Sequence, residues 1–576
     1  MHARLSRLAR RIVPALAVLV LAAGLAGCMG AGAPEVEPAP DGGAPAQAAV
    51  DIQEADGAQR FVPAGGTDLT LKIASGSENK EAAEAIAYAA GEAGVTVEMH
   101  YMGSLEIRSV LEAGGADYDA VWPASSMWIS LGDTGHITRN AQSTSTTPVV
   151  FGIARGRAEE LGWVDASGAT ASPTTAEILD AVEAGELSFA MTSATQSNSG
   201  ASAYLAFLTA LSGSDGPLTA DDLADAELTG RVAALLSGVD RSSGSSDWLK
   251  EMVVADPGAH QAMVNYESLV SQADRELEEA GAEPLMAIYP ADGIAVSDSP
   301  LAYVDRGQDA AVEDAFLAFQ QALADDEATL AMERVGRRCG LGGKILHADD
   351  PEVQAAFSPD WGIVDDASVL KSIPLPAGEV IGEALTLYQT ALKKPSYSIW
   401  VVDYSGSMYG EGKDGVVAGL ERALDPALAA ASLIQPTEGD VNVLIPFADG
   451  PGEAVVAEGA DTAPVLDAAR SREPMGGTDI YAALEAALEL AEQAEAEGRW
   501  TVAIALMSDG QSETENRARF EGAYDASGTD VPVFSIMFGS ADPAQLDDLS
   551  ALTNGRTFDG RTGDLAAVFR QVKGYN

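Results

Sequence analysis

The sequence of 576 residues predicts an α/β protein in which helices cover sheets of largely parallel strands. From about 67 to 365, strand and helix patterns alternate: residues 69–74 alternate in polarity, 81–93 have helical periodicity, and 95–100 alternate again. Further along, residues 399–402 form a continuous apolar run, which suits a central parallel strand covered on both faces. The chain is long enough for two or three domains with full-sized cores.

Oxygen-bearing side chains follow this apolar run. Asp403, Ser405 and Ser407 form an Asp-x-Ser-x-Ser pattern that begins where the strand would end. In open α/β sheets, ligands bind beyond the carboxyl ends of the strands. Hard divalent cations such as Mg²⁺ take oxygen ligands and keep several waters. The pattern therefore predicts a partial cage for a divalent metal ion.

Two later segments strengthen this prediction. Residues 475–479, Met-Gly-Gly-Thr-Asp, precede an amphipathic helical pattern at 481–494. The apolar run 501–507 reads as a second buried strand, and it ends at Ser508, Asp509 and a turn glycine. We expect all three loops to lie on one rim of the sheet.

With these motifs, residues 395–576 resemble a von Willebrand factor type A (VWA) domain, a Rossmann-like, doubly wound fold with a metal-ion-dependent adhesion site (MIDAS). The resemblance implies that three hydroxyls bind the ion, that two aspartates hold it largely through water, and that a sixth position accepts a carboxylate from a partner protein. The matching positions are Ser405, Ser407 and Thr478 for the hydroxyls, with Asp403 and Asp509 for the carboxylates. Mg²⁺ is the expected ion, and Mn²⁺ or Ca²⁺ are alternatives. Helix N-caps and turn residues are the simpler explanation of the same pattern.

A second resemblance covers residues 67–365. Its motifs are Ala-Ser-Gly-Ser-Glu-Asn at 74–79, Asp-Ala-Val-Trp-Pro-Ala-Ser-Ser at 119–126, Thr-Thr-Pro-Val-Val-Phe-Gly-Ile-Ala at 146–154, Thr-Gln-Ser-Asn-Ser-Gly at 195–200, Leu-Met-Ala-Ile-Tyr-Pro at 285–290 and Phe-Ser-Pro-Asp-Trp-Gly-Ile at 357–363. Together they resemble the extracellular solute-binding proteins of bacterial uptake systems. The resemblance implies a two-lobed, periplasmic-binding-protein-like domain around a cleft. After it, prolines at 374 and 376 and the helical periodicity of 379–393, which ends before Pro395, predict a linker with a helix at 366–394.

Polar turns at expected helix starts are the candidate solute contacts of this region. Helix starts expose amide protons and a positive dipole end, which suit anions or polar solutes. The candidates are Ser75, Ser77, Ser125, Ser197 and Asn198. The same residue types are ordinary N-caps, so capping is the alternative. Glu78, beside the first loop, is an unfavourable neighbour for an oxyanion.

The amino terminus predicts export and lipid anchoring. Four arginines precede an apolar stretch, and Leu-Ala-Gly-Cys at 25–28 resembles the lipobox of bacterial lipoproteins. The resemblance implies a signal peptide at 1–27 and acylation of Cys28, which would anchor the protein on the extracytoplasmic face of the cell membrane. An ordinary secretion signal is the alternative. Residues 28–66 are rich in Ala, Pro, Gly and acidic residues and predict a disordered tether.

Composition narrows the function. The chain has 34 Lys and Arg against 87 Asp and Glu, a formal net charge of -53, which excludes a nucleic-acid-binding protein and leaves the lipid as the membrane attachment. Its five histidines lack ligand spacing, and phosphate-loop and dinucleotide motifs are absent from the sequence, so we expect no catalytic residues.

The sequence therefore predicts a cell-surface lipoprotein that binds a partner protein through a divalent metal in its VWA domain. The solute-binding-like domain would act as a sensor or second binding surface. The alternative is the solute receptor of an ATP-driven (ABC-type) importer, with the VWA domain as a docking module.

Overall fold

The computed structural model describes residues 49–576, apart from 56–57, 510–511, 513–515, 540, 542, 562–564 and 575–576. The predicted signal peptide, the lipidation candidate Cys28 and most of the predicted tether lie outside these residues. Within the described part, none of the helices combines the length and the apolar character that a membrane crossing needs.

The first lobe is built on a sheet whose central strands are parallel. Strand β3 pairs in parallel with β4 and β5, as the alternation of strand and helix patterns predicts. The strands lie in the order β1 (Val50–Ala55), β2 (Ala58–Pro63), β4 (Thr96–Met102), β3 (Thr70–Gly76), β5 (Ala120–Trp122), β13 (Pro300–Val304) and β6 (Thr138–Ser143). The helices are η2 (Ser77–Ala82), α1 (Ala83–Ala93), α2 (Ser104–Glu112), α3 (Ser126–Gly132), α11 (Ala310–Ala322) and α12 (Asp326–Arg334).

The hairpin of β1 and β2 corrects part of the predicted tether at 28–66. The two strands pair in antiparallel register, and β2 also pairs with β4. Phe61 is fully buried in the core of this lobe. The low overall apolar content of the segment concealed a strand that the neighbouring sheet stabilises, because one well-placed aromatic residue is enough to fix the buried face.

The second lobe has a sheet of its own with β7 and β10 near its centre. Its strands lie in the order β11 (Leu285–Ile288), β7 (Thr147–Ala154), β10 (Ala262–Tyr266), β8 (Phe189–Thr192) and β9 (Val239–Ser243), and β12 (Val296–Ser297) pairs with β7. The helices are α4 (Arg155–Glu160), α5 (Thr175–Glu183), α6 (Asn198–Ser212), α7 (Ala220–Leu223), α8 (Ala226–Leu236), α9 (Ser246–Ala255), α10 (Glu267–Glu279) and α13 (Pro351–Ala356). The chain enters this lobe after β6 and returns to the first lobe between β12 and β13, so the two lobes are joined by more than one crossing.

A short connection leads to the third sheet. It contains the 3₁₀ turns η3 (Pro359–Trp361) and η4 (Ala367–Val369), helix α14 (Gly378–Leu387) and the π-helical turn η5 (Tyr388–Leu392). This agrees with the predicted helix before Pro395. Tyr204 of α6 donates a hydrogen bond to the Ala384 carbonyl (3.0 Å), so α14 packs on the second lobe.

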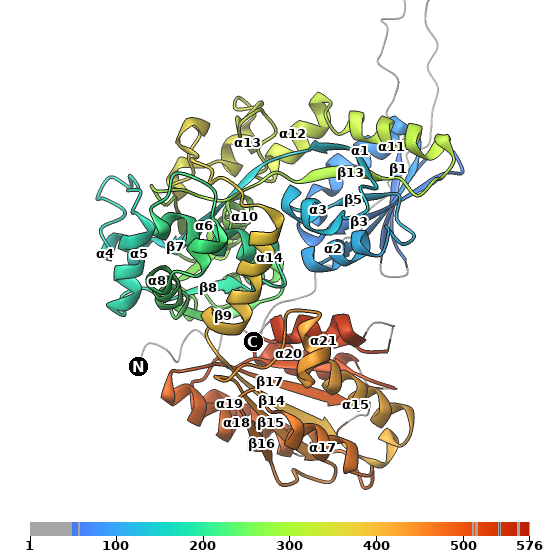
Figure 1. Ribbon diagram of the computed structural model, residues 1–576, viewed down its shortest axis with the longest axis vertical. Helices are drawn as coiled ribbons and strands as arrows, with labels where there is room; N and C mark the ends of the chain where they lie inside the picture. The colour runs from blue at the N-terminus through green and yellow to red at the C-terminus, as the bar shows by residue number, and fades with distance from the viewer. Residues whose placement is uncertain are drawn as a thin grey trace, which may run out of the picture. The chain divides into compact units, whose positions relative to one another are not determined.

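The third sheet is doubly wound, with the buried strand β14 at its centre (Figure 1). Its order is β16 (Val455–Glu458), β15 (Val441–Phe447), β14 (Ser396–Asp403), β17 (Thr501–Ser508), β18 (Val533–Met537) and β19 (Thr557–Asp559); β16 is antiparallel and the rest are parallel. The helices are η6 (Gly406–Met408), α15 (Glu411–Leu424), α16 (Pro426–Ala430), α17 (Ala463–Ser471), α18 (Ile480–Glu497), α19 (Arg517–Ser527), α20 (Pro543–Leu552) and α21 (Leu565–Gly574). Ile399 and Val401 pack in one core with α18, whereas Trp400 and Val402 pack in the other with α15 and α21.

A buried ion pair ties the end of the solute-binding-like region to the second lobe. Arg338 Nε and Nη2 donate to the two carboxylate oxygens of Glu267 at 2.7 and 3.0 Å, and neither side chain is more than 1% exposed. The Gly343 carbonyl accepts a further hydrogen bond from Arg338 (3.1 Å). Such a pair tolerates poorly the loss of one partner, because the remaining charge stays buried.

We therefore expect Glu267→Gln to lower the free energy of unfolding by about 3–5 kcal/mol, because it leaves the Arg338 guanidinium buried without its carboxylate. Urea unfolding followed by tryptophan fluorescence measures this change. Glu279→Gln at the exposed end of the same helix is the control, with an expected change within about 0.5 kcal/mol. Equal stability of the two variants would contradict the assigned role of the pair.

Candidate metal centre and solute cleft

Asp403 ends a strand that is buried throughout its last six residues. Its Oδ1 accepts a hydrogen bond from the Ser405 amide (2.7 Å), and its Oδ2 accepts one from the Ser508 hydroxyl (2.6 Å). Burial raises the pKa of the Asp403 carboxyl and the charge of Asp509 adds to the rise, whereas the hydrogen bonds from Ser508 and Ser405 oppose it. Among the described residues, the main groups that oppose this rise are hydrogen-bond donors rather than a positive charge.

A chain of side-chain hydrogen bonds links the loop after β14, which carries Ser405 and Ser407, to the end of β17. The hydroxyls of Ser405 and Ser407 lie 3.0 Å apart, and Ser407 Oγ donates to Asp509 Oδ1 at 2.8 Å. Because Asp403 and Asp509 end neighbouring parallel strands, their side chains arrive at the same edge of the sheet. Four of the five predicted ligands thus form one cluster.

The third loop lies directly against the first. The Gly406 amide donates to the Gly476 carbonyl (3.0 Å), and the Met475 amide donates to the Tyr404 carbonyl (2.8 Å). Asp449 Oδ1 accepts from the Gly477 amide (2.6 Å) and supports the loop from its other side. Thr478 lies two residues after Gly476 and is partly buried, and its carbonyl accepts a hydrogen bond from Ser512 Oγ (3.3 Å).

This arrangement suits a hard cation. The candidate ligands are hydroxyls and carboxylates, which are the oxygen donors that Mg²⁺, Mn²⁺ and Ca²⁺ prefer. Groups of three or more His, Cys, Asp or Glu side chains that could hold a metal ion are not found among the described residues. The present set has only two carboxylates, because three of its five members are hydroxyls. Two exposed side chains, Tyr409 and Met475, lie in the loops beside it, 78% and 72% exposed.

The predicted solute contacts are mostly engaged inside the protein. Asn198 accepts from Trp128 Nε1 (2.8 Å) and donates to Tyr266 Oη (2.9 Å) and Ser297 Oγ (2.8 Å). The others also have partners within the protein. Ser75 accepts from the Asn79 amide group (2.9 Å), Ser125 accepts from the Met127 amide (3.3 Å), and the Ser197 hydroxyl lies 2.9 Å from that of Ser246. These four are buried. Ser125 also lines a cavity with Ser126 and Thr146, and Ser77 lines a different cavity.

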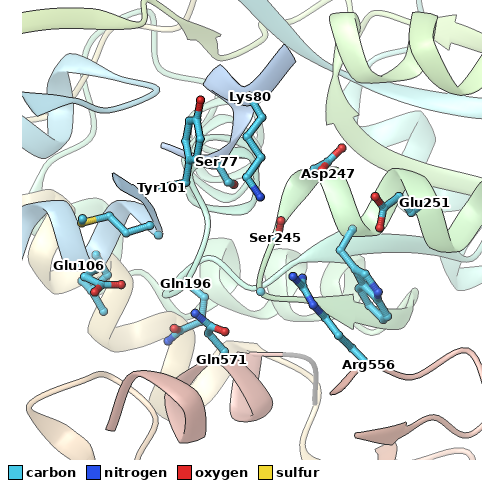
Figure 2. Close-up of a pocket in the computed structure, with 15 residues that line it drawn as sticks. Ser77, Lys80, Tyr101, Glu106, Gln196, Ser245, Asp247, Glu251, Arg556 and Gln571 are labelled. Atoms are coloured by element: carbon cyan, nitrogen blue, oxygen red, sulfur yellow. The ribbon is translucent and has the colours of Figure 1, made fainter. Parts of the chain in front are cut away.

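That cavity lies between the two lobes and has a volume of about 210 Å³. Charged side chains of both signs line it, together with Ser77, Gln196 and Ser245 (Figure 2). The charged residues are Lys80, Glu106, Asp247, Glu251 and Arg556. Arg556 comes from the loop before β19, so the third sheet contributes to the wall.

Comparison with known families agrees with this division. Residues 71–338 match the family of bacterial extracellular solute-binding proteins, and residues 399–511 match the von Willebrand factor type A domain. The chain joins a bacterial solute-binding domain to a VWA domain. Both sequence resemblances and the predicted α/β fold class are thereby confirmed. Among curated proteins, none matches the chain.

Solved structures similar to the chain include periplasmic binding proteins. AfuA from Actinobacillus pleuropneumoniae, with exogenous fructose-6-phosphate bound, is 13% identical with a TM-score of 0.41, over 56% of this chain and 98% of that one. The ferric binding protein from Campylobacter jejuni is 15% identical with a TM-score of 0.38, over 55% and 98%. Maltose-bound MalE3 from T. maritima is 12% identical with a TM-score of 0.40, over 56% and 93%.

Two residues of the VWA domain escaped the sequence analysis. Ser508 holds Asp403, and Asp449 holds the loop before Thr478. Ser508 directly precedes Asp509 at the end of an apolar run, and that position could have identified it. Asp449 follows β15 in a Gly-rich turn and carries no comparable signal, because its role depends on the turn lying beside a loop remote in sequence.

Gly476 allows a test of the third loop. Its φ is +87°, and an added Cβ would lie 2.6 Å from Asp449 Oδ2. We expect Gly476→Ala to lower the free energy of unfolding by about 2–3 kcal/mol, since backbone strain and the contact add. Thermal and urea unfolding measure the change.

Gly498 is the matched control, because its φ is +68° and an added Cβ meets nothing within 4 Å. Gly498→Ala should show backbone strain alone, about 1 kcal/mol. Equal effects at the two positions would show that Asp449 does not hold the loop.

Proposed function

We propose that this protein is an extracytoplasmic binding protein whose VWA domain binds a divalent cation and, through it, a carboxylate of a partner protein. The observation that carries the proposal is the hydrogen bond from Ser407 Oγ to Asp509 Oδ1 (2.8 Å), which joins two loops far apart in the sequence. Asp403, Ser405 and Ser407, with Thr478 and Asp509, would hold the ion. The solute-binding domain would act as a sensor or second binding surface.

The chemistry of the cluster supports a metal. Two carboxylates and two hydroxyls share a network in which the pKa of Asp403 is raised mainly by burial. A bound cation supplies a positive charge, and it replaces hydrogen bonds between hydroxyls by coordination. Few of the donors are charged, so the ion keeps affinity for one more carboxylate.

The surroundings of the cluster support a protein partner. Tyr409 and Met475 expose most of their side chains on the loops that carry the metal ligands. Exposed aromatic and Met side chains are enriched in the centres of protein interfaces, where they are anchors for affinity. A partner that presents a carboxylate beside apolar side chains would match both features.

Location follows from the solute-binding family, which indicates an extracytoplasmic protein. Our proposal adds anchoring through a lipid on Cys28, after removal of the signal peptide. It also holds that the protein binds without catalysing a reaction. The competing role is the solute receptor of an importer, in which the VWA domain would be the docking module. Metal-dependent binding of a partner protein that is not part of a transporter would favour our proposal over this role.

The metal site predicts a specific loss. The full chain should bind Mg²⁺ or Mn²⁺ in calorimetry and unfold at higher temperature in its presence, whereas Asp403→Ala should abolish both effects. A ligand at a hundred times its Kd contributes about 2.7 kcal/mol of stability, which is readily measured. A chelator should return the wild-type protein to the melting temperature of the variant in metal-free buffer.

Asp547→Ala is the charge-matched control, because Asp547 is exposed on α20 of the same domain. It should bind metal as the wild type does. Retention of metal binding in Asp403→Ala would reject the site, and an equal loss in both variants would point to nonspecific charge.

A further inference from the structure

The cavity between the lobes is lined by charged side chains of both signs. Residues 47–576 form one compact unit, and the wall of the cavity comes from both lobes and from the VWA domain. Figure 2 shows Lys80 and Arg556 entering from different walls, with Ser245 between them. Asp247 and Glu251 lie one turn apart on α9, so they share the face that borders the cavity.

The positive side of the wall is held in place. Lys80 Nζ lies 5.5 Å from the centre of the Tyr101 ring, and this cation–π contact positions the ammonium group over the cavity. The Arg556 guanidinium carbon lies 5.8 Å from the centre of the Phe558 ring. An anionic group between the two cations would meet both charges and the hydroxyl of Ser245.

A buried donor points to the same ligand group. Gln196 is 6% exposed and lines the cavity, and its Nε2 finds no hydrogen-bond partner within the described part of the chain. A buried amide without an acceptor costs about 1–3 kcal/mol. An oxyanion in the cavity would satisfy it.

The carboxylates on the other side disfavour a simple anion. Burial raises the pKa of the Glu251 carboxyl and the charge of Asp247 raises it further, although Lys250 and Arg556 oppose the rise. Asp247 Oδ1 lies 3.9 Å from Lys250 Nζ, so its compensation is weak. Behind Ser77, burial raises the pKa of Glu78 to about 7, and its Oε1 has no hydrogen-bond partner in the described residues.

We propose that this cavity binds a small zwitterion of the amino-acid type, with its carboxylate toward Lys80, Arg556 and Gln196 and its ammonium toward Asp247 and Glu251. The proposal rests on the solute-binding role proposed above and names the class of solute. A simple anion would face the carboxylates and a simple amine would face the cations, whereas a zwitterion pairs with both. The volume of about 210 Å³ limits the ligand to a small one.

The test is a panel of solutes on the full chain, read by thermal shift and calorimetry. Glycine, L-alanine and L-serine carry both charges, acetate and phosphate carry the anion, methylamine carries the amine, and glycerol is neutral. At least one amino acid should bind saturably. Acetate, phosphate, methylamine and glycerol should each bind at least about tenfold more weakly than that amino acid. If acetate, phosphate, methylamine or glycerol binds as well, the class is wrong and the solute role stands. If nothing binds while Mg²⁺ still binds, both the class and the solute role are rejected and the metal site is unaffected.

Two variants locate the binding site. Glu251→Gln should weaken amino-acid binding by about tenfold, since each tenfold corresponds to the loss of about 1.4 kcal/mol, and it should reduce the preference for an amino acid over acetate. Lys80→Gln should weaken amino-acid and acetate binding together. If either residue had only a structural role, its substitution would weaken the binding of amino acids and acetate in the same way in both variants.

Glu183→Gln and Lys344→Gln are exposed controls outside the cavity wall and should bind as the wild type does. Mg²⁺ binding reports that each variant is folded. Unchanged amino-acid binding in Glu251→Gln and Lys80→Gln would overturn the proposed site.

Discussion

The parallel strand β14 is the constraint on which the candidate metal centre depends. It is paired along its length with β15 on one side and β17 on the other, so it cannot shift in register without exposing apolar side chains on both faces. Asp403 is its last residue and Asp509 follows its neighbour β17. The pairing therefore fixes the spacing of the two carboxylates, and the hydroxyls of the intervening loop are left to fill the space between them.

In the solute-binding domain, the polar groups at the helix starts bind one another inside the protein. Asn198 and its partners Trp128, Tyr266 and Ser297 form a buried network in which each described contact is internal. Such a network stabilises one arrangement of the helix starts, because a buried polar group that loses its partner is costly. The side chains that line the cavity are instead longer ones, such as Lys80 of η2 and Glu251 of α9.

The loops of Asp403 and Asp509 could be placed from the sequence, because each follows an apolar run whose place in a parallel sheet is recognisable. The loop at 475–479 could be placed from the helical pattern that follows it. Solute contacts are harder to assign from the sequence, since Ser75, Ser197 and Asn198 occupy positions where capping, internal hydrogen bonding and solute contact all favour the same residue types. The hairpin of β1 and β2 was missed for another reason: its stability comes from β4, a strand that follows it in the chain. Arg556 could not have been assigned to the cavity, because only tertiary packing brings it to residues of the first lobe.

The last helix of the VWA domain, α21, contacts the second lobe through Gly574. The Gly574 carbonyl accepts a hydrogen bond from Ser242 (3.0 Å), and a Cβ at this glycine would lie 2.7 Å from Gln196 Cγ. Along the same helix, Phe569 packs against Gly419 of α15, which begins just after the metal loop. Helix α21 thus borders both the Gln196 side chain, which lines the cavity, and α15, which begins just after the loop of Ser407. Loss of this one helix would therefore remove packing contacts beside both places at once.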